Sequence, residues 1–262
     1  MNILETIIAE KRKEVEAAKQ RISIDELEKE YFFKNEVLSL KSFIKDPART
    51  GIIAEFKRKS PSKGIINDKV SVEEVTMAYA AGGASGLSVL TDEKFFGGSL
   101  NDLVTATVNE VPLLRKDFMI DVYQLYEAKA FGAEVILLIA ACLTKREVKG
   151  LAAAAKDIGL EVLLEIHDES ELEHICDEVD LVGVNNRNLK TFTVDLEQSI
   201  RLSEQIGTYK LKIAESGISS VENLLYLKRS GFDGFLIGEN FMKHADPAIA
   251  FADFVHQLKT AT

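Results

Sequence analysis

The sequence contains little cysteine, no excess of positive charge and no long hydrophobic run. Its two cysteines, Cys142 and Cys176, cannot build a disulfide framework, which makes the reducing cytoplasm the simplest expected location. The net charge of −10 argues against nucleic acid or an anionic membrane as a partner, because both need a broad basic face. The longest apolar run, residues 135–143, is too short to span a bilayer, and the N-terminus lacks the apolar core of a signal peptide.

Motifs for nucleotide and metal binding are also missing. Neither a glycine-rich dinucleotide fingerprint nor a P-loop signature occurs, so no nucleotide cofactor is expected. His167 and His174 lie seven residues apart and the other two histidines stand elsewhere, so the spacing typical of metal ligands is missing too. We therefore expect no cofactor and no metal. The cysteines lack a CxxC pattern and are expected to serve in packing.

What the sequence does contain is a regular alternation of apolar segments. Eight short segments are rich in leucine or β-branched residues and apolar almost throughout, which is typical of strands covered on both faces. These segments are residues 52–57, 87–91, 112–116, 134–139, 161–166, 181–185, 211–215 and 234–237.

The longer segments between these strands begin with a common signal. A Ser, Thr or Asp is followed three residues later by Glu or Gln, the capping-box pattern of a helix N-terminus. The pattern begins at Ser71, Asp121, Thr144, Asp168, Asp195 and Ser219. Glycines also stand where a helix C-terminus favours a left-handed residue. These glycines are Gly82, Gly132, Gly159, Gly207 and Gly231.

Repeated alternation of strand and helix predicts an α/β fold with a parallel sheet, and eight units favour closure into a (β/α)8 TIM barrel. We expect a single domain over residues 1–262. Within it, residues 1–48 would form an N-terminal helical extension that packs on or caps the barrel, with Pro47 near the junction. The extension is indicated by Leu4, Ile8 and Val15 on one helical face and by a Ser23-x-x-Glu26 capping box.

Charged side chains end four of the predicted strands. Ile53, Glu55 and Lys57 share one parity, and three further inward rows end in charged residues, namely Lys116, Glu165 and Glu215. Alternate residues of a barrel strand point inward, and the C-terminal strand ends line the mouth where barrel enzymes carry their active sites. Burying such charges costs several kcal/mol unless they are paired. The charges therefore form either a structural ion network or a catalytic one with tuned pKa values.

The loops after the strands add groups suited to an anionic ligand. Residues 59–64 form a lysine-rich polar loop. Ser216-Gly217 and Gly238 follow the last two strands, where barrels often bind phosphate through backbone N–H groups. Each of these loops can also be an ordinary solvated turn.

Two further loops could contact an organic ligand. Asn185 and Arg187 would present an amide and a guanidinium, suited to a hydroxyl and a carboxylate. Phe96 and Phe118 could wall an aromatic ring, although these rings can equally belong to the core.

The strand ends carry a set of motifs that occur together in a known family. Residues 53–64 read IAEFKRKSPSKG, and the set continues with LTDEKFFGGS at 90–99 and LRKDF at 114–118. It ends with LLEIH at 163–167, GVNNR at 183–187 and AESGI at 214–218. In this order the chain closely resembles the indole-3-glycerol phosphate synthase family of tryptophan biosynthesis. The resemblance covers essentially the whole chain.

The resemblance implies a cofactor-free lyase that converts 1-(2-carboxyphenylamino)-1-deoxyribulose 5-phosphate to indole-3-glycerol phosphate, losing CO₂ and water. It implies Lys116 as the general acid, Lys57 as carboxylate contact and second acid, and Glu165 as the proton-transfer carboxylate. The other residues it places at the catalytic centre are Glu55, Asn185, Glu215, Ser216, Ser60 and Pro61. The residues it places around the substrate are Lys59, Phe96, Phe118, Arg187, Leu189, Gly217, Gly238 and Glu239.

Other functions remain open on the sequence. A Schiff-base lyase or aldolase would use a lysine such as Lys116 or Lys212 as nucleophile. A phosphoribosyl anthranilate isomerase would leave Lys57 and Lys116 without a role, and a non-catalytic phosphate-binding barrel would not need the charged strand ends. Glu239 departs from relatives with serine there, which would weaken phosphate binding if its side chain faced the ligand. We expect a monomer, because no extra exposed apolar stripe is recognisable.

Overall fold

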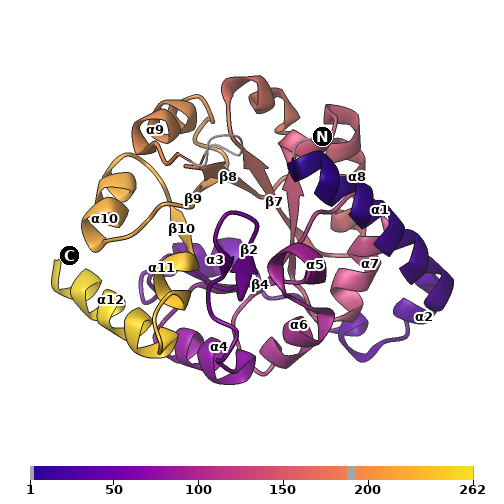
Figure 1. The fold of residues 1–262 in the computed structure, drawn as a ribbon. Helices are drawn as coiled ribbons and strands as arrows, with labels where there is room; N and C mark the ends of the chain where they lie inside the picture. The colour runs from indigo at the N-terminus through magenta and orange to yellow at the C-terminus, as the bar shows by residue number, and fades with distance from the viewer. Residues whose placement is uncertain (1–2, 188–192, 262) are drawn as a thin grey trace.

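The computed structural model describes residues 3–187 and 193–261, in which eight parallel strands close into a barrel (Figure 1). The strands are β1 (Ile52–Phe56), β4 (Gly86–Leu90), β5 (Leu113–Lys116), β6 (Val135–Ile139), β7 (Glu161–Ile166), β8 (Leu181–Asn185), β9 (Leu211–Glu215) and β10 (Gly234–Ile237). Each pairs with its neighbour in chain order, and β1 closes the barrel by pairing with both β10 and β4. The predicted TIM barrel is confirmed.

Helices surround the strands in a ring (Figure 1). The longer ones are α4 (Val72–Ala81), α6 (Leu100–Ala106), α7 (Tyr123–Ala130), α8 (Lys145–Asp157), α9 (Leu196–Glu204), α10 (Val221–Arg229) and α12 (Pro247–Ala261). The short elements of the connections are the hairpin β2 (Lys59–Ser60) with β3 (Gly64–Ile65), α5 (Glu93–Phe96), η2 (Ala140–Cys142), η3 (Glu169–His174) and α11 (Glu239–Met242). Between β7 and β8 the expected helix is thus a single 3₁₀ element, η3.

Most of the predicted helix starts are correct, and two differ. Ser71, Thr144 and Asp195 cap α4, α8 and α9 by accepting a hydrogen bond from the backbone N–H three residues on. The cap of α10 is Ser220 instead of Ser219, because the hydroxyl of Ser220 accepts from the N–H of Asn223. Helix α7 begins only at Tyr123, with no side-chain cap from its N-cap residue. Asp168 accepts from Ser170, two residues on, and so opens η3.

The predicted helix-ending glycines are left-handed at three of five positions. Gly132, Gly159 and Gly231 have φ of 89°, 84° and 94°. After α4 the left-handed residue is Gly83, with φ of 97°, whereas Gly82 keeps φ of −73° as the C-cap. Gly207 does not take a positive φ. The positive φ explains why glycine is needed where it occurs.

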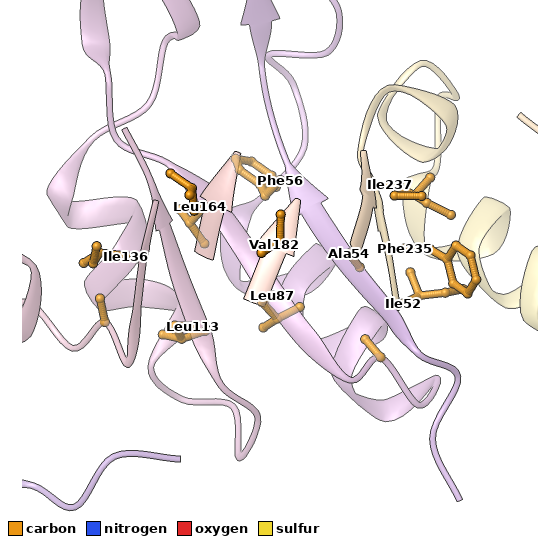
Figure 2. Close-up of a cluster of buried hydrophobic side chains, with 14 of the residues drawn as sticks. Ile52, Ala54, Phe56, Leu87, Leu113, Ile136, Leu164, Val182, Phe235 and Ile237 are labelled. Atoms are coloured by element: carbon orange, nitrogen blue, oxygen red, sulfur yellow. The ribbon is translucent and has the colours of Figure 1, made fainter. Parts of the chain in front are cut away.

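The apolar core has two layers, one on each face of the barrel wall. The outer layer lies between strands and helices and includes Phe56, Ile136 and Phe235 (Figure 2). The inner layer fills the barrel and includes Ile53, Leu114, Leu163 and Ile213. Ile53 was predicted to point inward, and the other three stand two residues before Lys116, Glu165 and Glu215. The charged strand ends share their parity and so also face the barrel interior.

The chain before β1 covers both ends of the barrel. It comprises α1 (Ile3–Arg21), α2 (Ile24–Leu27), η1 (Tyr31–Lys34) and α3 (Leu40–Lys45). Leu40 and Ile44 of α3 belong to the inner layer, and Leu40 approaches Gly86 at the start of β4. Helix α1 instead lies by the C-terminal strand ends, where its first turns line a pocket with Lys116 and Glu165.

The buried face of α1 agrees with the predicted one at Val15 and differs at the other two positions. Ile7, Lys11 and Val15 are buried, whereas Leu4 and Ile8 are only half-buried. The second helix begins at the predicted capping box, in which Ser23 and Glu26 each accept from the other's backbone N–H. Within residues 3–187 and 193–261, no helix is long and apolar enough to cross a membrane.

Candidate active site

The charged strand ends converge at the mouth of the barrel. The Nζ atom of Lys116 at the end of β5 lies 3.0 Å from Oε2 of Glu165 and 2.6 Å from Oε2 of Glu215. Lys57, just past β1, donates from Nζ to Oε1 of Glu55 at 2.7 Å. The carboxylates of Glu55, Glu165 and Glu215 are almost completely buried. Each of them is paired with a lysine, which offsets the cost of burying its charge.

Neutral side chains complete the network. The amide of Asn185 donates from Nδ2 to Oε1 of Glu165 at 3.1 Å. The hydroxyl of Ser88 on β4 donates to Oε2 of Glu55 at 3.4 Å. These contacts fix the orientation of both carboxylates.

The environment moves the pKa values of Glu165 and Glu215 in opposite directions. Burial alone raises the pKa of each carboxyl, and the Lys116 cation lowers it. For Glu165, the lowering effect of Lys116, His167 and Asn185 exceeds the effect of burial, and the pKa falls well below the usual range. For Glu215, the raising effect of burial and of the neighbouring Glu165 exceeds that of Lys116, and the pKa rises to about 7. The pair therefore offers one ionised carboxylate and one group that exchanges protons near neutrality.

Lys116 itself is held in its protonated form. Burial lowers the pKa of this lysine, but the carboxylates of Glu165, Glu215 and Glu55 more than offset that effect and raise it. A protonated, desolvated ammonium at the mouth can donate a proton to an oxyanion that develops within its reach.

An apolar pocket adjoins this network. Its walls come from α1, with Ile3, Leu4 and Ile7, and from the barrel. The predicted aromatic residues Phe96 and Phe118 both line it, with ring centroids 6.0 Å apart. Other predicted site residues that line it are Glu55, Lys57, Ser60, Pro61, Lys116, Glu165, Asn185, Arg187, Glu215 and Ser216. Its aromatic and aliphatic walls suit a flat ring, and its charged side chains suit polar groups on that ring.

A second, polar pocket lies beside the first and shares Lys57 and Arg187 with it. It is lined by the loops after β9 and β10, including Gly217, Gly238 and Glu239. A Cβ atom on Gly238 would stand 2.5 Å from Oε1 of Glu55, so glycine is required for this close approach. Of the non-glycine residues described, only Ser216 has a left-handed φ, 65°, a strained backbone typical of ligand-binding turns.

The Glu239 side chain faces this second pocket. Its Oε2 accepts from Nη2 of Arg187 at 3.1 Å, and its Oε1 lies 3.8 Å from Nζ of Lys63. Burial raises the pKa of this carboxyl, but Arg187 outweighs it and the net pKa is lowered. An ionised carboxylate thus shares the cations that a bound phosphate would use.

One of the described predicted residues, Lys59, is not brought to either pocket. Lys59 lies in the β2–β3 hairpin, and its Nζ donates to the carbonyl oxygen of Lys94 at 2.7 Å. Leu189 falls outside the described residues. Lys212, one of the lysines considered as a nucleophile, donates from Nζ to the carbonyl oxygen of Ser203 on α9 and so points away from the mouth.

Two charged residues near the site had no signal in the sequence. Lys11 of α1 is 4% exposed, and its Nζ lies 2.9 Å from Asp92 Oδ2, 2.8 Å from Asp117 Oδ1 and 2.6 Å from Glu14 Oε2. It fixes α1 to the ends of β4 and β5, directly beside Lys116. The second residue is His167, whose Nε2 lies 3.0 Å from Oε1 of Glu165. Lys11 acts on partners that are distant in the chain, whereas the partners of His167 are two and four residues away and meet its ring through the turn into η3.

Comparison with known proteins gives a consistent result. The model of the family "Indole-3-glycerol phosphate synthase" matches residues 4–254. The indole-3-glycerol phosphate synthase of Bacteroides thetaiotaomicron is 49% identical over 98% of this chain and 99% of its own. That of a Polaromonas species is 41% identical over 96% of this chain and 97% of its own.

Solved structures support the fold. A mutant tryptophan synthase alpha-subunit from Pyrococcus furiosus superimposes with a TM-score of 0.61 at 14% identity, covering 81% of this chain and 99% of that one. At so low an identity the likeness extends to the barrel alone.

Proposed function

The chain belongs to the indole-3-glycerol phosphate synthase family, and from this premise we propose how the residues at its barrel mouth divide the work of the reaction. The activity is that of a lyase of tryptophan biosynthesis that acts on a small phosphorylated aromatic substrate. It closes the indole ring of 1-(2-carboxyphenylamino)-1-deoxyribulose 5-phosphate and releases CO₂ and water. The observation that carries the residue roles is the Lys116 ammonium held between two buried carboxylates beside an apolar pocket.

The first step needs an acid. The aryl carbon that bears the carboxylate attacks the C2' carbonyl carbon, and the carbonyl oxygen gains negative charge as its π bond breaks. Lys116 donates a proton from Nζ to this oxygen. Its raised pKa keeps it protonated until negative charge develops on the oxygen, and it lies in the pocket wall. Loss of CO₂ then returns its bonding electrons to the ring and restores aromaticity.

The second step is a dehydration. The C2' hydroxyl accepts a proton from Lys57 or from the reprotonated Lys116 and leaves as water. The C1' carbon loses a proton, and the electrons of its C–H bond form the new double bond. Glu165, whose pKa is lowered, is the carboxylate proposed to move this proton. Glu215, whose pKa is about 7, can return a proton to Lys116 across their 2.6 Å contact.

The remaining residues hold the substrate. Lys57, oriented by Glu55, would contact the substrate carboxylate, and Asn185, which donates to Glu165, would contact a substrate hydroxyl. Phe96 and Phe118 would flank the anthranilate ring, as would Leu189. The phosphate would bind in the polar pocket at the backbone of Ser216, Gly217 and Gly238, near Arg187 and Glu239. The Ser60-Pro61 turn shapes the neighbouring loop, and Lys59 would have to leave Lys94 to reach the phosphate.

The Glu165 role predicts the kinetics of one variant. Glu165→Gln keeps the size and the hydrogen bond to Asn185 but cannot take up a proton. We expect kcat to fall about 10²-fold or more while KM changes little. The rise in indole fluorescence on mixing protein with substrate, without added metal or nucleotide, measures both constants. Glu169→Gln, an exposed residue of η3, is the matched control. A lower KM at an unchanged kcat would contradict the assignment.

A Schiff-base mechanism predicts a different outcome for a trapping experiment. An acid–base enzyme forms no covalent bond to the substrate, so borohydride added to protein and substrate should leave the protein mass unchanged. A mass increase that disappears in Lys116→Met would instead identify Lys116 as a nucleophile. Intact-protein mass spectrometry decides between the two.

We also propose a monomeric cytoplasmic protein with residues 1–262 as one domain. The support for one domain is that Leu40 and Ile44, from before the barrel, complete its inner core. The support for the location is that Cys142 and Cys176 are both free thiols.

A further inference from the structure

His167 stands between two carboxylates at the end of β7. Its Nε2 lies 3.0 Å from Oε1 of Glu165, and its Nδ1 lies 3.3 Å from Oε2 of Glu171 on η3. The backbone N–H of His167 also donates to Oε2 of Glu171 at 2.6 Å, which fixes the ring against that carboxylate. The side chain is 11% exposed, so water does not replace either contact.

This geometry favours the protonated ring. A neutral imidazole carries one N–H and one lone pair, so one of its nitrogens would stand next to a carboxylate oxygen without a proton. An imidazolium instead donates from Nδ1 to Glu171 and places its positive charge beside Glu165, where Nε2 lies 3.0 Å from Oε1 as an ion pair without hydrogen-bond alignment. Burial lowers the pKa of His167, but Glu165 and Glu171 together outweigh it and raise the pKa to about 10.

The other titratable groups around the ring do not compete for this charge. Lys116 and Glu215 lie on the far side of Glu165 and pair with each other. Cys142 of η2 stays a neutral thiol, because burial, Glu165 and Glu171 all raise its pKa. Glu165 therefore has two cationic neighbours, Lys116 at Oε2 and His167 at Oε1.

The proposed reaction removes one of these two cations for part of the cycle. When Lys116 gives its proton to the substrate oxygen, its amine is neutral and no longer balances Glu165. A buried carboxylate without a cation takes up a proton readily, which would remove the base that the dehydration needs. A second cation that does not take part in the reaction prevents this.

We propose that His167 is a positioning residue that remains an imidazolium throughout the cycle and keeps Glu165 ionised and oriented. This role rests on the proposed function of Glu165, but the charge of His167 does not, and the two are tested separately. The imidazolium also explains why Glu171 is directed back at the end of β7 from the adjacent 3₁₀ element.

The charge is measured without substrate. The chain has four histidines, so ¹⁵N spectra of protein labelled at histidine are simple, and His167→Asn identifies the His167 signals by their loss. We expect both ring nitrogens of His167 to keep imidazolium shifts from pH 5.5 to 8.5. A titration with a midpoint near the ordinary value of about 6.5 would overturn the proposal.

The effect on Glu165 is measured by the pH dependence of kcat/KM. An adjacent cation lowers a carboxyl pKa by about 1–3, so its loss in His167→Asn should move the midpoint of the acidic limb to a pH higher by that amount. At a pH well below the acidic midpoints of both proteins, kcat/KM of the variant should be about tenfold lower for each increase of one in the pKa of Glu165. Above the midpoint of the variant, its kcat/KM should return towards that of the unchanged protein. His167→Lys, which restores a cation, should move the limb back.

The matched control is His174→Asn in η3, the 3₁₀ element that also carries Glu171. His174 contacts the backbone carbonyl oxygens of Glu171 and Leu143, and neither of its ring nitrogens faces a carboxylate. Its profile should keep the original acidic limb. A uniform loss of rate at all pH values in His167→Asn, or an unmoved limb, would reduce His167 to a structural residue and overturn the proposal. If the unchanged protein shows the predicted imidazolium signals of His167 but does not close the indole ring, the proposed function is wrong and the charge of His167 is not.

Discussion

Lys116→Met is expected to abolish measurable turnover. The substitution keeps the unbranched stem of the side chain but removes the ammonium that lies between Glu165 and Glu215. A positioned general acid typically contributes about 10²- to 10⁴-fold to a rate, and here the same cation also holds Glu165 in its ionised form. We expect kcat to fall by at least this factor, as measured by the rise in indole fluorescence.

The loss should be catalytic and not a failure to fold. Without Lys116, Glu165 and Glu215 would face each other, but a Glu215 with a pKa of about 7 can accept a proton and relieve the repulsion. His167 still balances Glu165. Circular dichroism and the unfolding temperature of the variant should therefore show a folded barrel.

Two further lysine variants show whether the loss of turnover is specific to Lys116. Lys212→Met changes a strand lysine that binds a backbone carbonyl oxygen away from the mouth, and it should leave kcat unchanged. Lys57→Met tests the second candidate acid, and a smaller loss of kcat with a larger rise in KM would place Lys57 on the substrate carboxylate. Near-normal turnover in Lys116→Met would show that Lys116 is not the acid.

Lys11→Met is expected to destabilise the protein by about 3–5 kcal/mol, the usual effect of removing one partner of a buried ion pair. Methionine retains the apolar stem and leaves Asp92 and Asp117 buried beside each other without their shared cation. Urea unfolding measures the free energy. KM should rise as well, because Lys11 holds the helix whose Ile7 lines the substrate pocket.

The effect of Lys11 should depend on pH with a known sign. Burial raises the pKa of Asp117, but Lys11 and Arg115 outweigh it and the net pKa is lowered well below the usual range. A carboxyl whose pKa is lowered in the folded state stabilises the fold at any pH above its unfolded pKa of about 3.9. This stabilisation is lost as the pH falls through the folded pKa. The difference in free energy of unfolding between Lys11→Met and the unchanged protein should thus be largest near neutrality and shrink in acid.

The control for this helix is Lys13→Met. Lys13 has a 76% exposed side chain and pairs only on the surface, with Glu10, so its loss should change stability by no more than about 0.5 kcal/mol. Equal effects of the two substitutions would show that the buried contacts of Lys11 do not anchor α1.

The barrel and the charged centre could be predicted from sequence because both follow from local patterns. Strand parity alone places Ile53 and Glu55, or Leu163 and Glu165, on the same inward face, and closure of the sheet brings the ends together. One predicted helix start is wrong because two candidate caps stand side by side. Ser219 and Ser220 are chemically equal as caps, and only the approach of the chain to α10 selects Ser220.

Lys11 and His167 could not be predicted because their partners are distant in the chain or unrecognised. Lys11 stands in a run of charged residues that reads as a solvated helix face, yet its partners Asp92 and Asp117 belong to other strand ends. His167 lacks the spacing of a metal ligand, and its use as a cation depends on the fold of η3, which returns Glu171 to it. Tertiary electrostatics decided both positions.

The two helices that cover opposite ends of the barrel have a consequence for the order in which the chain folds. Helix α1 docks on early parts of the barrel, since Lys11 pairs with Asp92 and Asp117 and Val15 packs against Tyr123 of α7. Helix α3 instead shares the inner layer with Leu236 of β10, and Ile44 lies against Gly234 at the start of that strand. Contacts between such distant parts of the chain form slowly. The cover at the mouth can thus form before the barrel closes, whereas the cover at the other end is completed only when β10 has paired.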